Sequence, residues 1–425
     1  MKILSHPKFI TYLILCIGLI FNTNSAYATP PLTTLNQLIK IATQNNADLK
    51  SKKLAWQSLI QKYPQAIALN DPRISYTEAL RPIETRLGPQ DRILSLNQKL
   101  PFPGKLELKG EVVWSEIKTA KIRYDKASRD LIVNIKQSFH ELVYLENAIQ
   151  LSLKNKKLLE TINKISSADY AADISTLNDV AKAQSQYAQV SYDVQLLTEL
   201  RSSEKTRINT LLNRHPEYNF RVRSNTQKPA KLAHKLINLY RWADTNEELQ
   251  IADLAIEKSS IEKKLAGYAE RPDFDLGLRY TQIGSSGING VKNNSKDGLA
   301  VSIGISIPLN FEKNNAIKEQ ARLNQLKNIE AKKALKHRLR NKVKGIYFKL
   351  NNSYRLITLY GDNLIPQANR ALQIAQLQYR QNKGSIAKYL ETQSTWLNFQ
   401  LAYQRALADY AKNIAEMERL TGKSL

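Results

Sequence analysis

The chain has 425 residues, of which 42% are hydrophobic and 24% are charged, which is typical of a folded protein with enough chain for a large core. Its formal net charge is +25, but the lysines and arginines are spread along the chain. We therefore expect acidic partners or anionic lipid headgroups and no nucleic acid. No spacing among the histidines forms a zinc site, and the five are His6, His140, His215, His234 and His337. We expect no catalytic site, no cofactor and no resident metal, and therefore no enzyme.

The N-terminus has the pattern of a secretory signal peptide. Lys2 and Lys8 flank the start of an apolar run at 9–21, and residues 26–28 (AYA) form a small-x-small cleavage site. We predict a signal peptide at 1–28, after whose removal the net charge falls from +25 to +23 and the only cysteine, Cys16, is lost. No later stretch reaches the roughly 18 consecutive apolar residues of a membrane helix, so any membrane-spanning part would consist of strands.

The chain repeats itself, which decides the architecture before any single motif does. Leu49 in NNADLK matches Leu249 in TNEELQ at an offset of 200, and residues 170–185 match 379–394 at an offset of 209. We predict two tandem copies, at 29–213 and 234–425, joined by a linker at 214–233. Each copy contains a helix, a strand pair, a long helix, a small turn and a second long helix.

Long helices are predicted at about 104–213 and 313–421. From 104 to about 168 only Gly110 interrupts the helical pattern, and from 314 to 381 only Gly345, Gly361 and Pro366 do. At 1.5 Å per residue, a helix of about 65 residues is a rod of about 100 Å, which few globular domains contain. The adjacent acids Glu247 and Glu248 are interpreted as solvated helix surface.

Strand pairs are predicted at about 72–100 and 273–308. In 273–283 and 298–307, apolar residues alternate with small or polar ones over about ten residues, the length of an outer-membrane strand with one face toward lipid. The connection at 284–297 is rich in glycine and asparagine, as an exposed loop should be. In the first copy, 73–80 and 93–100 alternate less cleanly, and a loop containing Pro82, Gly88 and Pro89 is expected between them.

A soluble hairpin packed on the helices would explain one strand pair alone, but two pairs at matching positions of an exported chain favour membrane strands. Four strands cannot close a barrel, so several chains would share one. At the strand-helix joints stand Pro101, Pro103 and Gly104 in the first copy and Pro308 in the second. There proline ends the strand ladder, and in the first copy glycine permits the change of direction.

On these features, over essentially the whole mature chain, the sequence resembles the TolC family of outer-membrane efflux ducts. The residues that carry the resemblance are LTTLNQLIKIATQNNADLK, NQKLPFPGKL, ISIPLNF and the paired turns at 170–185 and 379–394. LPFPGK looks most like the CzcC-type branch, which serves heavy-metal resistance. The resemblance implies a mainly α fold with a small β part: a long α-helical barrel joined to a transmembrane β-barrel shared by a homotrimer, four strands per chain.

The resemblance also implies that the two small turns form a periplasmic tip that closes the tunnel. Asp179 and Tyr379 fall where the family has a polar contact that holds the tip closed. Lys388 and Glu391 fall where its type member has two acids around the aperture, so an acidic ring is not expected here. Asp173 and Asn382 replace the turn glycines, and both residue types tolerate the left-handed conformation.

These features predict an exit duct in the outer membrane with a long periplasmic part. It would passively conduct substrate, heavy-metal cations in the first instance, from an inner-membrane resistance-nodulation-division (RND) pump through a periplasmic adaptor protein. The same duct serving drug efflux or type I protein secretion is one alternative. A periplasmic coiled-coil scaffold without a pore is another.

Overall fold

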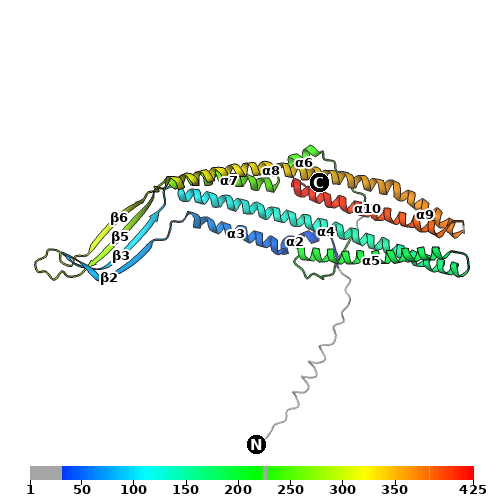
Figure 1. The fold of residues 1–425 in the computed structure, drawn as a ribbon, viewed down its shortest axis with the longest axis horizontal. Helices are drawn as coiled ribbons and strands as arrows, with labels where there is room; N and C mark the ends of the chain where they lie inside the picture. The colour runs from blue at the N-terminus through cyan, green and yellow to red at the C-terminus, as the bar shows by residue number, and fades with distance from the viewer. Residues whose placement is uncertain (1–30, 224–226, 382) are drawn as a thin grey trace, which may run out of the picture.

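The structure, a computed structural model, describes residues 31–223, 227–381 and 383–425. The predicted signal peptide and Asn382 lie outside these ranges. The described chain is mainly helical with one four-stranded sheet, which confirms the predicted fold class of long helices with a small β part. The sheet lies at one end of an elongated molecule and the two helical turns at the other (Figure 1). None of the helices in these ranges combines the length and the apolarity that crossing a membrane requires.

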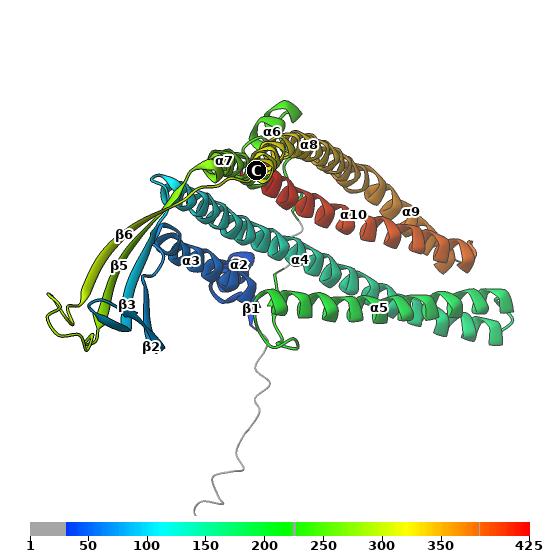
Figure 2. The same cartoon turned by 60° about the vertical axis from the view of Figure 1, so that its left-hand side comes forward.

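The helices form four rods that lie side by side. The contacts between helices of neighbouring rods define the order of the rods. The first rod stacks α3 (Ala47–Ile67) on α5 (Leu177–Leu211), and the second is α4 (Lys105–Ala171). The third stacks α7 (Glu247–Gly267) on α10 (Ile386–Thr421). The fourth runs through α8 (Phe311–Thr358), a π-helical turn η2 (Leu359–Leu364) and α9 (Ile365–Arg380). Figure 2 shows the rods side by side in this order.

The two stacked rods are joined in the same way. Asn46 and Asn246 each cap the helix that follows, accepting a hydrogen bond from Leu49 N and Glu248 N respectively. Their amide groups donate across the joint, from Asn46 to the carbonyl of Leu211 at 3.0 Å and from Asn246 to that of Leu420 at 3.1 Å. One side chain thus satisfies free backbone groups on both sides of each joint.

The long fourth rod bends at a defined place. α8 continues through Gly345 without a break, contrary to the interruption expected there, whereas Gly361 lies in the π-helical turn and Pro366 opens α9. A side chain at 361 would approach the ring of Tyr403 to 2.9 Å, so the glycine allows α10 to pack closely against this turn. Gly361 and Pro366 therefore mark a real irregularity in the rod.

The sheet continues the order of the rods. Its strands are β2 (Arg73–Thr85), β3 (Gly88–Leu100), β5 (Asp273–Ile283) and β6 (Gly298–Ser306), all antiparallel and in that spatial order. The loop expected at 284–297 is confirmed by the ends of β5 and β6. Each strand joins one rod, so β2 belongs with α3, β3 with α4, β5 with α7 and β6 with α8.

The first hairpin differs from the prediction. β2 and β3 extend through the expected loop, and only Arg86 and Leu87 connect them. The pairing register shifts between Glu78 and Ile83, so Pro82 lies in an irregularity of an edge strand, where its missing N–H removes no ladder hydrogen bond. The prolines were therefore wrongly interpreted as the end of the strand.

Smaller elements close the middle of the molecule. β1 (Leu32–Thr33) pairs in parallel with β4 (Arg221–Val222), and α2 (Leu35–Asn45) and α6 (Leu236–Ala243) precede the first and third rods. The turn η1 (Tyr268–Glu270) leads from α7 into β5. Glu247 is buried and forms an ion pair with Arg129 at 2.7 Å, so its assignment to solvated surface was wrong.

Candidate functional site

One face of the sheet is apolar across all four strands. The register aligns Ile74, Leu96, Leu278 and Val301 in one row and Tyr76, Leu94, Tyr280 and Leu299 in the next. These side chains are exposed, with 73% of Ile303 and 76% of Val301 accessible. No helix packs on this face within the described chain. Such a large unpartnered apolar surface requires a partner or a lipid environment.

The opposite face of the sheet is polar. Ser75, Ser95, Arg279 and Ala300 share one row, and Arg73, Asn97, Gly277 and Ser302 share another. Gly277 has no room for a side chain, because an added Cβ would lie 2.3 Å from the Ser302 hydroxyl. The alternation that the sequence predicted for β5 and β6 therefore extends to the first hairpin as well.

The first strand-helix joint is rigid. Gly104 has a φ of 85°, and a Cβ there would lie 2.8 Å from the Tyr268 hydroxyl, so this position requires glycine. Asp273 at the start of β5 accepts hydrogen bonds from Phe102 N and from Lys105 Nζ, at 3.1 and 2.9 Å. Phe102 lies between Pro101 and Pro103. Through Phe102 and Lys105, the joint of the first copy is hydrogen-bonded to Asp273 of the second copy.

The second joint uses different residues. Pro308 lies two residues after the end of β6, and its carbonyl accepts a hydrogen bond from the Asn314 side chain at 3.4 Å. Asn310 caps α8 by accepting from Lys313 N at 2.9 Å. Here an asparagine cap replaces the glycine of the first joint.

Both edges of the molecule are open. Among the described strands, β2 and β6 each have a neighbour on one side only. The rods beneath them expose apolar side chains: Leu54, Tyr192 and Leu196 on the first rod, and Leu323, Leu326 and Phe348 on the fourth. An exposed strand edge and an apolar helix face therefore occur together on each side of the molecule.

The tip is a four-helix bundle in which α4 and α5 pack on α9 and α10. Its core joins Leu159, Ile162 and Val190 to Ala375, Ile386 and Leu390. The Tyr379 hydroxyl donates to Asp169 of α4 at 3.4 Å, and its ring stacks on Tyr389. Burial and the Asp169 carboxylate raise the pKa of Tyr379. Tyr379–Asp169 therefore links the two coils within one chain, as does the buried hydrogen bond that Gln393 donates to Asn155 at 2.8 Å.

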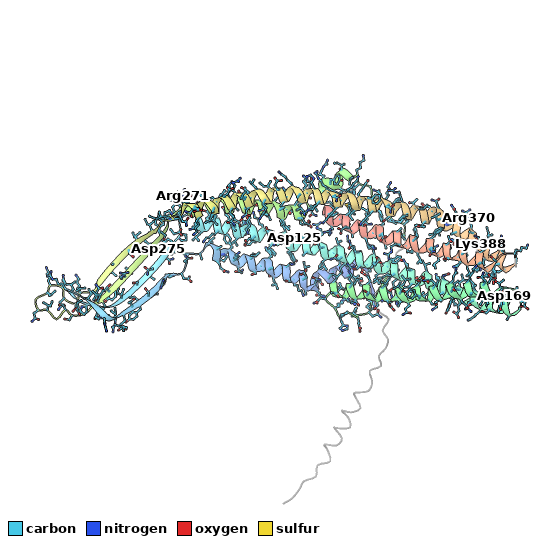
Figure 3. The ribbon with its side chains drawn as sticks, viewed as in Figure 1. Asp125, Asp169, Arg271, Asp275, Arg370 and Lys388 are labelled. Carbon is cyan, nitrogen blue, oxygen red and sulfur yellow. The ribbon has the colours of Figure 1, made fainter. Side chains whose placement is uncertain are left out.

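The other predicted tip residues have local partners. Asp179 accepts hydrogen bonds from Thr176 in a capping box at the start of α5, and its charge contributes to the raised pKa of Tyr379. Lys388 and Glu391 pair with each other at 3.1 Å, both largely exposed. Asp173 has a φ of 56°, so the left-handed turn expected there is present. Lys388 and Asp169 lie at the same end of the molecule, far from Asp275 in the sheet (Figure 3).

A polar seam joins the two copies between α4 and α10. Glu141 accepts two hydrogen bonds from Arg405, at 2.8 and 2.9 Å, and one from Lys412 at 2.6 Å. Although burial opposes ionisation, these bonds hold the pKa of Glu141 below its usual value. At the adjacent position of α4, burial and the charges of Lys136 and Lys412 lower the pKa of His140 to about 4.

Sequence reasoning missed Asp169, Glu141 and Arg405, because each acquires its role from a partner more than 200 residues away. In the part of the chain that the structure describes, no group of three or more His, Cys, Asp or Glu side chains is placed to hold a metal ion.

Comparison with known proteins points to one family. Residues 239–423, most of the second copy, match the family described as outer membrane efflux protein. The comparison with curated protein sequences found no match.

The whole fold resembles solved outer-membrane channels. The crystal structure of VceC from Vibrio cholerae is similar at a TM-score of 0.74 and 15% identity, over 92% of this chain and 96% of that one. CusC, described for its folding and transmembrane channel formation, gives 0.74 and 15% over 92% of each chain. The open state of the MtrE channel of Neisseria gonorrhoeae gives 0.69 and 17% over 92% of this chain and 89% of that one. The chain therefore has the fold of these proteins, and most of its second copy matches the family described as outer membrane efflux protein.

Proposed function

We propose that the chain is one third of a trimeric exit duct in the outer membrane, whose helical part crosses the periplasm. The apolar face that spans all four strands supports this most directly, because its exposed side chains would face lipid. β5 and β6 have 11 and 9 residues, the length that a tilted membrane strand needs.

The open edges of the sheet indicate how several copies of the chain would close into one barrel. In lipid, the free backbone groups of β2 and β6 each cost several kcal/mol unless a strand of another copy pairs with them. β6 of one copy would pair with β2 of the next, and the apolar sides of the fourth and first rods would meet below them. Such unlike edges form a ring rather than a two-faced dimer. Two copies would give eight strands, whose interior side chains fill, whereas three give twelve and leave a lumen.

The tip would close this lumen. Tyr379, Asp169 and Asp179 lie together where the two coils turn, and Lys388 and Glu391 lie on the first two turns of α10. We propose that the Tyr379 contact holds the coils together in the closed state, and that Lys388 and Glu391 influence which ions pass.

The proposal also includes the partners of the duct and its cargo. A periplasmic adaptor and an inner-membrane RND pump would load the duct, which has no chemistry of its own. Heavy-metal cations as cargo rest on the LPFPGK joint alone, and drug efflux or type I secretion uses the same geometry. A metal-sensitivity assay on a deletion strain, beside an antibiotic panel, separates these cargoes.

The duct itself is tested by extraction and conductance. We expect the protein to need detergent for release from membranes, to purify as a trimer and to conduct in planar bilayers. Release by salt as a soluble protein without conductance would instead identify a periplasmic scaffold.

A further inference from the structure

The basic charge is concentrated on one helix. α8 carries thirteen lysines and arginines against three glutamates. In a wall of parallel rods, a helix has two sides toward its neighbours, one toward the outside and one toward the lumen. The sides of α8 can be assigned from its contacts.

The two neighbour sides carry the large apolar residues of α8, and the side away from the third rod also carries its three glutamates. Leu339, Val343 and Leu350 are buried against the third rod. At 100° per residue, Leu323, Leu326 and Phe348 lie on the opposite side of the helix. They are exposed in the single chain, where a neighbouring copy would cover them.

The outer side carries cations that are already neutralised. Lys336 and Arg340 pair with Asp244, at the end of α6, at 3.2 and 2.9 Å. The chain before α6 also packs on this side of the wall, where Tyr410 donates to the carbonyl of Ala230. A segment crossing inside the duct would obstruct it, so the side that α6 covers is the outside. In Figure 2, α6 projects beyond the layer of rods.

The remaining side carries a stripe of free cations. Helical spacing places five exposed residues within about 60° of one another: Lys313, Lys327, Arg338, Lys342 and Lys349. None of the five forms an ion pair within the described residues, and the glutamates of α8 lie on other sides of the helix. Lys349 lines a groove between α8 and α10 in which Arg405 and Lys412 are neutralised by Glu141 and Asp409, so Lys349 supplies its free charge.

The polar face of the sheet has the same sign. Arg73, Lys99 and Arg279 are exposed there and form no ion pair within the described chain. The same face carries two carboxylates, Asp273 and Asp275, of which Asp273 is paired with Lys105. The lumen sides of the sheet and of α8 therefore both carry an excess of unpaired cations, and three copies would turn each cation into a ring of three.

We infer that the lumen of this duct selects for anions and that its cargo is negatively charged: an oxyanion or a carboxylated organic molecule. This rests on the proposed duct. A narrow channel with low-dielectric walls concentrates the field of its charges, so unpaired cations raise the local concentration of anions and lower that of cations. A free metal cation would pass against this field.

The test is the reversal potential of the purified trimer in planar bilayers under a KCl gradient. At low salt we expect Cl⁻ to permeate about tenfold more readily than K⁺. The preference should weaken toward molar salt, because the Debye length contracts from about 10 Å at 0.1 M to about 3 Å at 1 M.

Two matched triple variants test whether the stripe of cations on α8 produces the anion preference. Replacing Lys327, Lys342 and Lys349 by Gln should reduce the anion preference by about half or more, since nine cations leave the lumen of the trimer. Lys318→Gln, Arg322→Gln and Lys333→Gln remove as many charges from the other side of α8 and should leave the preference unchanged.

The outcomes are separable. A conducting trimer that prefers K⁺, or one that both triple variants affect equally, would overturn the anionic lumen and leave the duct intact. A protein that forms no trimer and no conductance would overturn the duct and, with it, the anion preference.

Discussion

Ile303→Arg tests the lipid-facing side of the sheet. Ile303 is the central member of the apolar positions of β6, which run at every second residue from Leu299 to Ile307. It lies opposite Leu276, and 73% of its side chain is exposed in the single chain. No residue of the described chain covers it, so the substitution creates no clash within the chain.

The expected cost follows from this central position. An arginine on the lipid side of a membrane strand costs about 2 to 4 kcal/mol near the midplane and about 0 to 1 near the interfaces. A residue at the centre of the apolar run belongs to the first range. Three copies would lose about 6 to 12 kcal/mol per trimer by the same figures, enough to reduce assembly strongly.

Ser302→Arg is the matched control. Ser302 lies one residue away, opposite Gly277 on the polar face, where an arginine would extend into the aqueous lumen. We expect Ile303→Arg to lower the yield of folded trimer in the membrane fraction sharply and Ser302→Arg to change it little, as measured by semi-native gel electrophoresis. Equal yields would show that this face does not contact lipid, because in water both positions would tolerate arginine.

Four further outcomes are expected. Tyr379→Phe with Asp169→Ala removes the bond between the coils nearest the turns, worth about 1 kcal/mol per chain, and should raise single-channel conductance even though Gln393–Asn155 remains. Lys388→Glu should shift ion preference toward cations, without a large change in conductance, as measured by reversal potential. Gly104→Ala should lower trimer yield, since its left-handed backbone costs about 1 to 2 kcal/mol with a side chain and Tyr268 occupies the space. Because the pKa of His140 is about 4 in the fold against 6.5 in the unfolded chain, stability should fall by up to about 3 kcal/mol as pH drops through this window. His140→Gln should remove that part of the slope in pH-dependent thermal unfolding.

The strand pairs were predictable because their side chains alternate. In β5 and β6 the apolar residues occur at every second position, and this period has no other common explanation in so short a segment. The first hairpin was harder, since Pro82 normally ends a strand. It is tolerated in β2 because that strand lies at the edge of the sheet, and the position of a strand within a sheet is not visible in its own sequence.

The tip pair shows a second limit. The repeat aligns Tyr379 with Tyr170, yet Tyr379 bonds Asp169 while Tyr170 is 45% exposed. The repeat predicts which segments are equivalent, but the contact between two equivalent helices depends on their relative rotation. That rotation is set by packing among Leu159, Ile162 and Leu390, whose partners are far apart in the sequence.

The charge of α8 shows why the lumen-facing cations could not be identified from the sequence alone. The lysines and arginines are spread along the sequence, so they suggested only acidic partners or anionic lipid headgroups. In the fold, Lys336 meets Asp244 across a helix boundary, whereas Lys342, six residues on, meets no acid in the described chain. Helical rotation places them on different sides of one rod, one toward the segment that covers the wall and one toward the lumen. Ion pairs therefore neutralise the cations on the outer side of α8, whereas those on its inner side stay unpaired. Only the unpaired cations would act on a substrate in the lumen.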